Sequence, residues 1–509
     1  MTIDDRLNRH LEQQAAAITL TPADAEGAMT RGRRRRTHRR VALTAVVVVA
    51  GLGVAVVAVD PGGNDPHVQS ALSATVAPTT FDWTLVAPHA GLGYGSETAL
   101  AGGSLYSLST APGRNVEPNP HQHLYRSDDG TEWTEVAMPP GLSTSSLAGS
   151  GDALYALGTA PSGGGRSLVV AASTDGAQHW TDLTLPADVQ TLDQRFPGQI
   201  QISAPTVAAR DASHVLVSVE VSSTPDVANQ IPGYDPDTQH LVTTAEGVDV
   251  YDECTGSCTG YDPAAAGANV DDAKRAQEKA SKTPTAHYRW DQLDVDPDLV
   301  ALVTGHTYVY ATQDGSHFAA SQLPAGLGGN DVKAVATADG YRLFLSDWPT
   351  DKTAVTTHVL SSTDGRTFTE SASPLAGSVG SAGVLGARPA VAVWNMDGTS
   401  DVYVEQSGAW GRLDLAQAGD GEATLGDVAF GPLGLAAVLW ETHGDRTSPL
   451  IVHSTDGSTV SPVPLDASFK GSVIGLSVTA DGIFVRLGDA PDGNDATAPT
   501  QHVLVGTPR

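Results

Sequence analysis

The chain has 509 residues, with 58 acidic and 29 basic side chains and a formal net charge of −29. Its 40% apolar and 17% charged residues are typical of a globular protein, and 54 Gly with 31 Pro favour an all-β fold rich in turns. So acidic an exterior argues against binding nucleic acid and against docking on anionic lipid.

The N-terminal segment predicts a membrane anchor. Residues 31–40 read RGRRRRTHRR, and the nineteen residues 41–59 that follow carry no charge. At ~1.5 Å per residue, a helix of that length spans roughly 28 Å, which is enough to cross the hydrocarbon core. Arginine on the N-terminal side places the N-terminus inside the cell. We therefore expect a cytoplasmic basic tail at 1–40, a single transmembrane helix at 41–59 and the remaining chain outside the plasma membrane.

Two other interpretations of the apolar segment stay open. A cleaved signal peptide would have an unusually long polar region before it, and no small-x-small cleavage site closes the segment directly. A twin-arginine export signal at Arg39-Arg40 is poorly matched by the residues after the pair, Val41-Ala42-Leu43. The anchored layout is similar to that of many single-pass envelope proteins of high-GC Gram-positive bacteria, a source that the low lysine content also fits.

Residues 60–80 are rich in Gly, Pro, Ser and Thr and predict a flexible linker. Beyond them, STDGRTF at 362–368 recurs in related copies after short apolar runs, and four of the five copies end in an aromatic residue. Its turn aspartates lie 46, 139, 50 and 92 residues apart: Asp129, Asp175, Asp314, Asp364 and Asp456. A period of about 40–50 residues with short strands is typical of a β-propeller.

This motif resembles the Asp-box, or bacterial neuraminidase repeat, of sialidase-like β-propellers. The resemblance implies an all-β propeller of four-stranded blades over residues 81–509. It also implies that the five aspartates are structural, because an Asp-box carboxylate ties the backbone of its own turn on the outer rim. We expect seven or eight blades: the count is eight if 203–289 forms a blade of its own and seven if its irregular part, 221–289, is an insertion.

The two ends of the expected propeller are incomplete on their own. Residues 473–507 supply three strands and stop, and residues 81–88 read as one strand without partners nearby. We therefore predict that Trp83–Val86 pairs with the C-terminal strands and closes the ring, which removes the exposed sheet edges.

The insertion contains the only two cysteines, Cys254 and Cys258. Outside the membrane the CTGSC loop favours a local disulfide, with free thiols as the next interpretation. Two sulfurs without a nearby Cys or His cluster make a poor zinc site. Residues 271–282 place acidic residues before basic ones and predict a short exposed helix.

Long loops between the second and third strands of several blades each carry one cation. These residues are Arg114, Arg166, Lys352 and Arg446. If they converge on one face, they form a cationic site on an acidic domain, suited to an anionic sugar or a peptide carboxylate. The alternative is that single cations merely keep long loops soluble.

Metal binding is weakly supported. One loop holds four oxygen-bearing side chains that suit Ca²⁺, though without EF-hand spacing: Asp489, Asp492, Asn494 and Asp495. His121 and His123 lack a third ligand, so we expect no resident metal or cofactor.

Sialidases use three arginines, a Tyr–Glu pair and an Asp acid/base. The nearest match to their early arginine motif is Arg195-Phe196-Pro197, in mid-chain and in the wrong order. No catalytic residue is carried over, so enzymatic activity stays open. We expect a binding or scaffold module for a glycan or protein ligand at the cell envelope. The alternatives are a sialidase-like glycoside hydrolase and a sensor that signals through its tail.

Overall fold

The computed structural model describes most of residues 68–508. The larger gaps are at 87–96, 111–121, 253–283, 348–354, 464–471 and 489–500, and a few short stretches of other loops are also left out. The expected tail 1–40, the expected membrane helix 41–59, the helix expected at 271–282 and both cysteines lie outside the described residues. Within the described part, no helix combines the length and the apolar content that a membrane crossing needs.

The described residues form eight sheets, and seven of them are built on four antiparallel strands, which we number 1 to 7 along the chain. Sheet 1 contains β4 (Glu97–Ala101), β5 (Ser104–Thr110), β6 (Gln122–Ser127) and β7 (Thr134–Val136). Sheet 2 contains β8 (Ser143–Ser150), β9 (Ala153–Ser162), β10 (Gly165–Ser173) and β11 (Thr181–Leu183). Sheet 3 contains β12 (Ile200–Ala209), β13 (Val215–Ser223), β17 (His306–Thr312) and β18 (Ala319–Ala320).

The other four sheets follow the same order. Sheet 4 contains β19 (Asn330–Thr337), β20 (Gly340–Asp347), β21 (Thr356–Ser362) and β22 (Thr369–Glu370), with β23 (Leu375–Ala376) also beside β21. Sheet 5 contains β24 (Ser378–Leu385), β25 (Arg388–Trp394), β26 (Ser400–Gln406) and β27 (Ala409–Leu413). Sheet 6 contains β28 (Glu422–Gly431), β29 (Gly434–His443), β30 (Arg446–Ser454) and β31 (Thr459–Val463). Sheet 7 contains β32 (Ser472–Val478), β33 (Ile483–Gly488), β34 (Gln501–Pro508) and β3 (Phe81–Val86).

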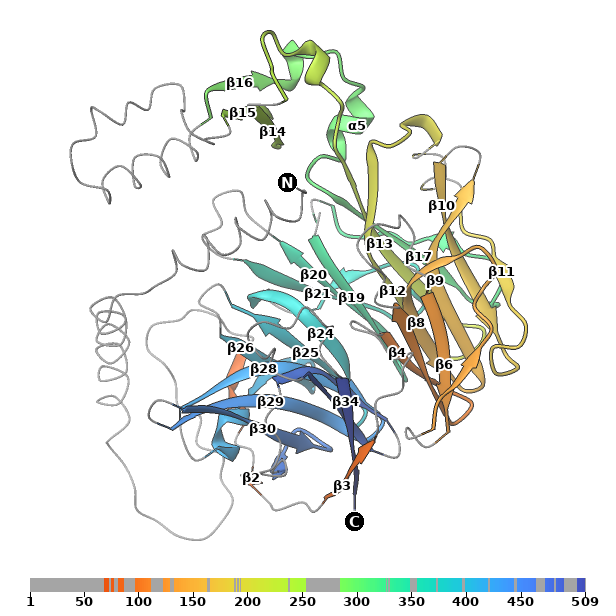
Figure 1. Cartoon of the computed structure of the whole chain (residues 1–509), viewed down its shortest axis with the longest axis vertical. Coiled ribbons are helices and arrows are strands. Elements are labelled where there is room, and N and C mark those ends of the chain that lie inside the picture. Colours follow the sequence, from red (N-terminus) through yellow and green to blue (C-terminus); the bar gives the residue numbers. More distant parts are fainter. Residues whose placement is uncertain are drawn as a thin grey trace, which may run out of the picture. The chain divides into compact units, whose positions relative to one another are not determined.

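Successive sheets pack against one another through their first strands. β4 contacts β8, β8 contacts β12, and the series continues through β19, β24 and β28 to β32. Sheets 7 and 1 meet through a cluster of Leu105 with Phe484, Val503 and Val505. In Figure 1 the sheets follow one another in sequence colour from orange to blue, and β3 lies beside β34. This is a propeller-like all-β fold.

The predicted pairing of the two ends is confirmed. β3 is antiparallel to β34, with Trp83 opposite Gly506 and Val86 opposite Val503. The ring of Trp83 lies over Gly506, where a Cβ would come within 2.6 Å of it. The first and last segments of the described chain thus share one sheet, which leaves no unpaired edge strand at that joint.

The higher blade count is wrong, because residues 203–289 do not form a blade of their own: β12 and β13 belong to sheet 3 together with β17 and β18. β13 pairs directly with β17, although 82 residues lie between Ser223 and His306 in the sequence. The intervening segment forms a separate three-stranded sheet of β14 (Gln239–Thr243), β15 (Gly247–Asp252) and β16 (Ala286–Arg289). Among the described residues the ring therefore has seven sheets.

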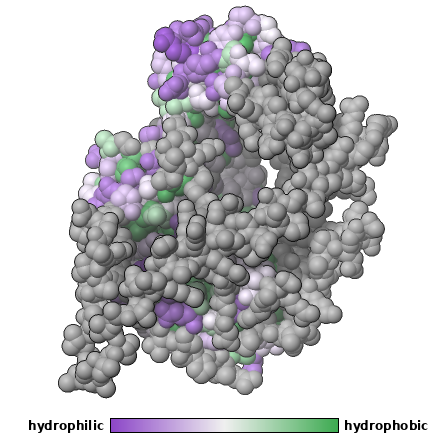
Figure 2. Space-filling model, turned by 90° about the vertical axis from the view of Figure 1, so that its left-hand side faces the viewer, coloured by the Kyte–Doolittle hydropathy of each residue, from purple (hydrophilic) through white to green (hydrophobic). Residues whose placement is uncertain are grey.

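This insertion has a small core of its own. The core consists of Val227, Ile231, Val248, Val250 and Leu293. Its short helices are η1 (Ala228–Gln230), η2 (Trp290–Gln292) and α5 (Pro297–Ala301). Outside the insertion, η3 (Leu415–Ala418) lies in the connection between sheets 5 and 6. Figure 2 shows the described residues of the insertion, at the top of the view, as mostly hydrophilic surface.

Two short segments of the linker expected at 60–80 form strands. β1 (Val68–Leu72) runs parallel to β27 in sheet 5, and β2 (Thr75–Val76) runs parallel to β31 in sheet 6. The expectation from composition fails here because the outer strand of a sheet presents unpaired N–H and C=O groups, which an adjacent extended segment can pair.

The sheets bring all connections of one kind to the same end of the ring. The turns between first and second strands, and between third and fourth strands, lie at one end, which we call the turn end. Hydrogen bonds between sheets confirm it: Gly102 N–H donates to Gly151 O (2.6 Å), and Leu433 N–H donates to Thr479 O (3.2 Å). The second strands end and the third strands begin at the opposite end, which we call the loop end.

Candidate functional site

The first strands of the sheets surround a central cavity of about 490 Å³, which we call the channel cavity. Six of these strands contain a register shift in the half nearer the loop end. The shifts lie between Thr144 and Ser146, Ser203 and Thr206, Asn330 and Val332, Val379 and Ser381, Leu425 and Val428, and Val473 and Gly475. A bulge bends its strand and changes which side chains face the cavity, so this recurring feature shapes the cavity wall.

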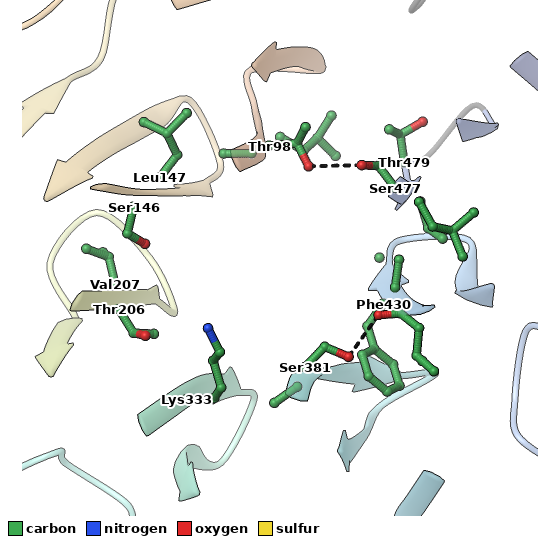
Figure 3. Close-up of a pocket in the computed structure, with 18 of the residues that line it drawn as sticks. Thr98, Ser146, Leu147, Thr206, Val207, Lys333, Ser381, Phe430, Ser477 and Thr479 are labelled. Atoms are coloured by element: carbon green, nitrogen blue, oxygen red, sulfur yellow. Dashed lines mark hydrogen bonds between the residues drawn. The ribbon is translucent and has the colours of Figure 1, made fainter. Parts of the chain in front are cut away.

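Hydroxyl groups dominate the polar part of this wall. Figure 3 shows Thr98, Ser146, Thr206, Ser381 and Ser477 around one central space. Several of them bind neighbouring strands. The Thr206 hydroxyl donates to the carbonyl of Val332 (3.2 Å), the Ser381 hydroxyl donates to that of Val428 (2.8 Å), and Thr98 bonds Ser477 (3.4 Å). The hydroxyls therefore join consecutive first strands and also join the first sheet to the seventh.

The charge of the channel cavity is opposite to that of the chain. Its described lining includes two cations, Lys333 and Arg486, and no Asp or Glu. Lys333 projects from β19 into the cavity (Figure 3), and its ammonium makes no hydrogen bond or ion pair with any described residue. The described wall of the cavity is therefore locally positive, although the chain has twice as many acidic as basic residues.

A second cavity of about 280 Å³ adjoins the first, and we call it the side cavity. The two share Ser381, Val428, Leu476 and Arg486, among others. The side cavity lies between sheets 5, 6 and 7 and extends toward the loop end, since Trp394 and Ser400 flank the loop between β25 and β26.

Three glycines in the bulged first strands make room for large side chains from the second strands. A Cβ on Gly380 would lie 1.8 Å from Nε1 of Trp394, and a Cβ on Gly426 would lie 2.7 Å from Nε1 of Trp440. A Cβ on Gly475 would lie 2.3 Å from Nη2 of Arg486. Because glycine has no side chain, two indoles and one guanidinium can lie directly against the backbone of the first strands.

The aspartates of the repeated motif lie at the turn end, away from both cavities. Asp314 Oδ1 accepts hydrogen bonds from the N–H groups of Ser316 (2.9 Å) and His317 (2.8 Å) and from the Thr312 hydroxyl (2.9 Å). These bonds, led by the one from His317, hold the pKa of Asp314 well below its usual range. Equivalent bonds to their own turns are made by Asp175, Asp364 and Asp456. Asp129 lies outside the described residues.

The residue that ends each motif packs between neighbouring sheets. Phe368 is 3% exposed and belongs to a cluster that joins sheets 3 and 4. Phe318 is also buried, and the indole of Trp180 donates to the carbonyl of Ala137 (2.9 Å). The described motifs therefore act on the turns and on the packing between sheets.

The predicted cationic loops are placed in part. Arg166 is in β10 and Arg446 is in β30, each beside the hairpin between the second and third strands, so both positions are at the loop end. Their side chains are not described, and Arg114 and Lys352 lie outside the described residues. Convergence of these four cations stays a prediction.

Sequence reasoning missed Lys333, Trp394 and Arg486. Lys333 lies in an alternating strand, NDVKAVAT, where a cation facing a central cavity has the same pattern as one facing solvent. One signal was present in the sequence: glycine inside a strand often marks a bulge or a close approach of another group. Gly380, Gly426 and Gly475 are such glycines, and each lies against a large side chain of the neighbouring strand.

Arg195 is not placed to bind a substrate carboxylate, because it already binds two carboxylates of this chain. Its guanidinium contacts Asp296 (2.8 Å) and Asp298 (2.6 Å), which are at the start of α5, and it lies over the ring of Phe196 at 4.7 Å. Arg195 thus ties the segment before β12 to the end of the insertion.

The described residues contain no group of three or more His, Cys, Asp or Glu side chains placed to hold a metal ion. His123 binds Glu135 (2.7 Å), whereas His121 and the loop from Asp489 to Asp495 lie outside the described residues.

No protein-family model matches the chain, and no curated protein matches its sequence. Among solved structures it is similar to the acylaminoacyl peptidase of Pyrococcus horikoshii, with 7% identity, a TM-score of 0.43 and coverage of 82% of this chain and 52% of that one. It is also similar to the Bombyx mori GH32 beta-fructofuranosidase BmSUC1 (10% identity, TM-score 0.34, 84% and 91% covered) and to YjhT (12%, 0.36, 77% and 99%). The chain spans about half the length of the peptidase that it matches. At these identities the likeness carries nothing about activity.

Proposed function

We propose that the chain is a binding module of the cell envelope whose ligand is an anionic, hydroxyl-rich compound held in the channel cavity. The observation that supports this most is the ammonium of Lys333, which projects into a cavity wall of Ser and Thr hydroxyls without a described partner. A cation at such a wall favours a carboxylate or sulfate, and the hydroxyls suit the hydroxyl groups of a sugar.

The envelope location is part of this proposal. It depends on the apolar segment 41–59 and on the arginines before it. An anchor there would hold the ring outside the cell. Localisation of the tagged full chain by protease accessibility in intact cells tests it: the ring should be cleaved from outside, and protection of the ring would contradict the proposal.

Binding requires fewer groups than hydrolysis. Glycoside hydrolysis generally uses two carboxylates on either side of the scissile bond. Asp427, at the side cavity, is the one carboxylate among the described residues that line the two cavities. The described cavities therefore contain what binding needs, and a sialidase-like hydrolase stays the alternative.

The test is calorimetric titration of the full chain with acidic and neutral oligosaccharides of matched length. Acidic oligosaccharides should bind, and Lys333→Gln should weaken that binding about 10- to 100-fold, because hydrogen bonds to a charged group contribute about 1.5–3 kcal/mol. Arg289→Gln is the control, since it removes an exposed cation of the insertion and changes the net charge equally. Equal affinity in the wild type and Lys333→Gln would contradict the proposal, and turnover of a fluorogenic sialoside would favour the hydrolase.

A further inference from the structure

Trp394 is exposed although tryptophan is usually buried. It is 42% exposed, and it is one of three large apolar side chains that are exposed among the described residues. It is the last residue of β25 and lines the side cavity. An exposed indole at a cavity leaves a flat apolar face of one aromatic ring in water, which costs free energy unless a ligand covers it.

The indole is held in one place. Its Nε1 side lies against Gly380, where even a methyl group would not fit. The next residue, Asn395, is also held in place, because its side-chain N–H groups donate to Asp401 (3.0 Å) and Thr399 (3.1 Å). A fixed aromatic ring loses little conformational entropy on binding, so it is suited to be a recognition surface.

Polar groups of three kinds surround the ring. The side cavity is also lined by the hydroxyls of Ser381 and Ser400, the carboxylate of Asp427 and the guanidinium of Arg486. The Ser400 hydroxyl is buried and has no hydrogen-bond partner among the described residues, which is rare for a buried polar atom. Ser400 is directly opposite Trp394 across β25 and β26. A hydroxyl-bearing ligand beside the ring would supply such a partner.

We infer that Trp394 is the stacking platform of a saccharide subsite in the side cavity. A pyranose presents an apolar face of C–H groups that matches the negative face of an indole, and hydroxyls around its edge that match the surrounding donors and acceptors. An apolar peptide side chain fits less well, because ligand pockets of that kind are lined mainly by hydrophobic groups. A volume of about 280 Å³ has room for a single sugar ring.

The inference rests on the proposed function, since it extends the anion site into the neighbouring cavity. The two cavities share Arg486 and Ser381. One acidic residue of an oligosaccharide would lie near Lys333, while an adjacent ring stacks on Trp394. The ligand class is then an acidic oligosaccharide of at least two residues, rather than a peptide carboxylate or an isolated sugar acid.

The experiment titrates the full chain with an acidic disaccharide, the corresponding acidic monosaccharide and a short peptide with a free carboxyl terminus. Trp394→Ala should weaken disaccharide binding at least tenfold and leave monosaccharide binding unchanged, whereas Trp394→Tyr should retain most of the affinity. Disaccharide binding should also change the tryptophan emission of the wild type, and Trp394→Ala should lose that change.

The outcomes separate this inference from the proposed function. Disaccharide affinity and emission change that are the same in Trp394→Ala and the wild type would overturn the inference and leave the anion site intact. The same holds if the peptide binds as tightly as the disaccharide. If the disaccharide binding depends on Trp394 but not on Lys333, the saccharide subsite stands and the proposed anion site fails. Binding of no saccharide at millimolar concentration overturns both.

Discussion

At the turn end of the ring, aspartate carboxylates bind the backbone of their own turns, aromatic residues fill the space between sheets, and glycines with positive φ close the turns. At the loop end, bulged first strands, glycines without positive φ and second-strand side chains surround two cavities. Both ends repeat a feature from sheet to sheet. The aspartates of the repeat at the turn end bind their own turns, whereas Lys333 and the Ser400 hydroxyl at the loop end face cavities and have no described partners. The difference teaches that a repeated motif marks the architecture, whereas the site is marked by polar side chains that line a cavity without a described partner.

The largest expected effect tests whether contacts at the turn end contribute more to stability than contacts at the loop end. Arg342 in sheet 4 binds Glu405 in sheet 5 (2.8 Å), and the two side chains are only 11% and 16% exposed. Arg342→Met leaves a buried carboxylate unpaired, so we expect the free energy of unfolding to fall by about 3–5 kcal/mol. Chemical denaturation of the full chain measures it, and ligand affinity below the transition should stay at the wild-type value.

Two further variants decide whether that loss comes from the unpaired charge. The double variant Arg342→Met/Glu405→Leu should recover most of the stability, because an apolar pair of similar volume replaces a buried ion pair with little loss. Lys333→Met at the loop end should change stability little, because no described residue pairs with Lys333. A larger loss from Lys333→Met than from Arg342→Met would reverse the comparison between the two ends.

An effect of intermediate size is expected from two glycine substitutions at the loop end, which differ in the side chain that the added methyl group would meet. An alanine methyl at Gly380 would meet the rigid indole of Trp394 at 1.8 Å, whereas one at Gly475 would meet the flexible end of Arg486 at 2.3 Å. We expect Gly380→Ala to cost about 1–3 kcal/mol of stability, the range for overpacking, and Gly475→Ala to cost less. Gly380→Ala should also lower disaccharide affinity, because it displaces the indole.

Thermal unfolding and titration of both variants measure these effects. The matched pair controls for the strain of adding a methyl to a bulged first strand. Equal losses of stability would show that the backbone of the bulge, rather than the side chain above it, sets the cost. Unchanged disaccharide affinity in a Gly380→Ala variant that is destabilised would separate Trp394 from binding.

The sequence predicted the turn end better than the loop end. STDGRTF at 362–368 carries its turn chemistry in neighbouring residues, so a local motif was enough to place Asp364 and Phe368. The pairing of Trp83–Val86 with the C-terminal strands was also predicted, because three C-terminal strands needed a fourth. The side cavity did not follow, since Gly380, Trp394 and Asp427 come together from different strands of two sheets. Its geometry depends on bulges, which alternation in a sequence does not reveal.

The insertion was also beyond local reasoning. Residues 203–289 contain strand-like runs that read as a blade, yet β13 continues into β17 beyond the insertion. Pairing between segments so far apart depends on burial, and Val215, Val217 and Val219 in β13 are fully buried in the ring. The apolar run of β13 indicated a buried strand, but it did not indicate which later strand would lie beside it.

The smallest expected effect concerns how stability depends on pH. One carboxylate at the turn end and one at the loop end should change stability with pH in opposite directions. At the turn end, the Arg366 N–H above all lowers the pKa of Asp364. Its stabilising effect is therefore present above the unfolded pKa of about 3.9 and is lost as the pH falls through the folded pKa. Asp364→Ala should cost about 1 kcal/mol at pH 7, as for a lost helix or turn cap, and less at acid pH.

At the loop end, burial raises the pKa of Glu220, although the N–H of Asp331 partly opposes that shift. The folded protein then favours the protonated form, so the resulting stability is present below the unfolded pKa of about 4.3 and is lost as the pH rises through the folded pKa. Glu220→Gln removes this titration, and its stability relative to the wild type should rise with pH. Denaturation of both variants from pH 3 to pH 8 measures the two slopes. Slopes of the same sign would mean that the two ends do not differ in how they hold their carboxylates.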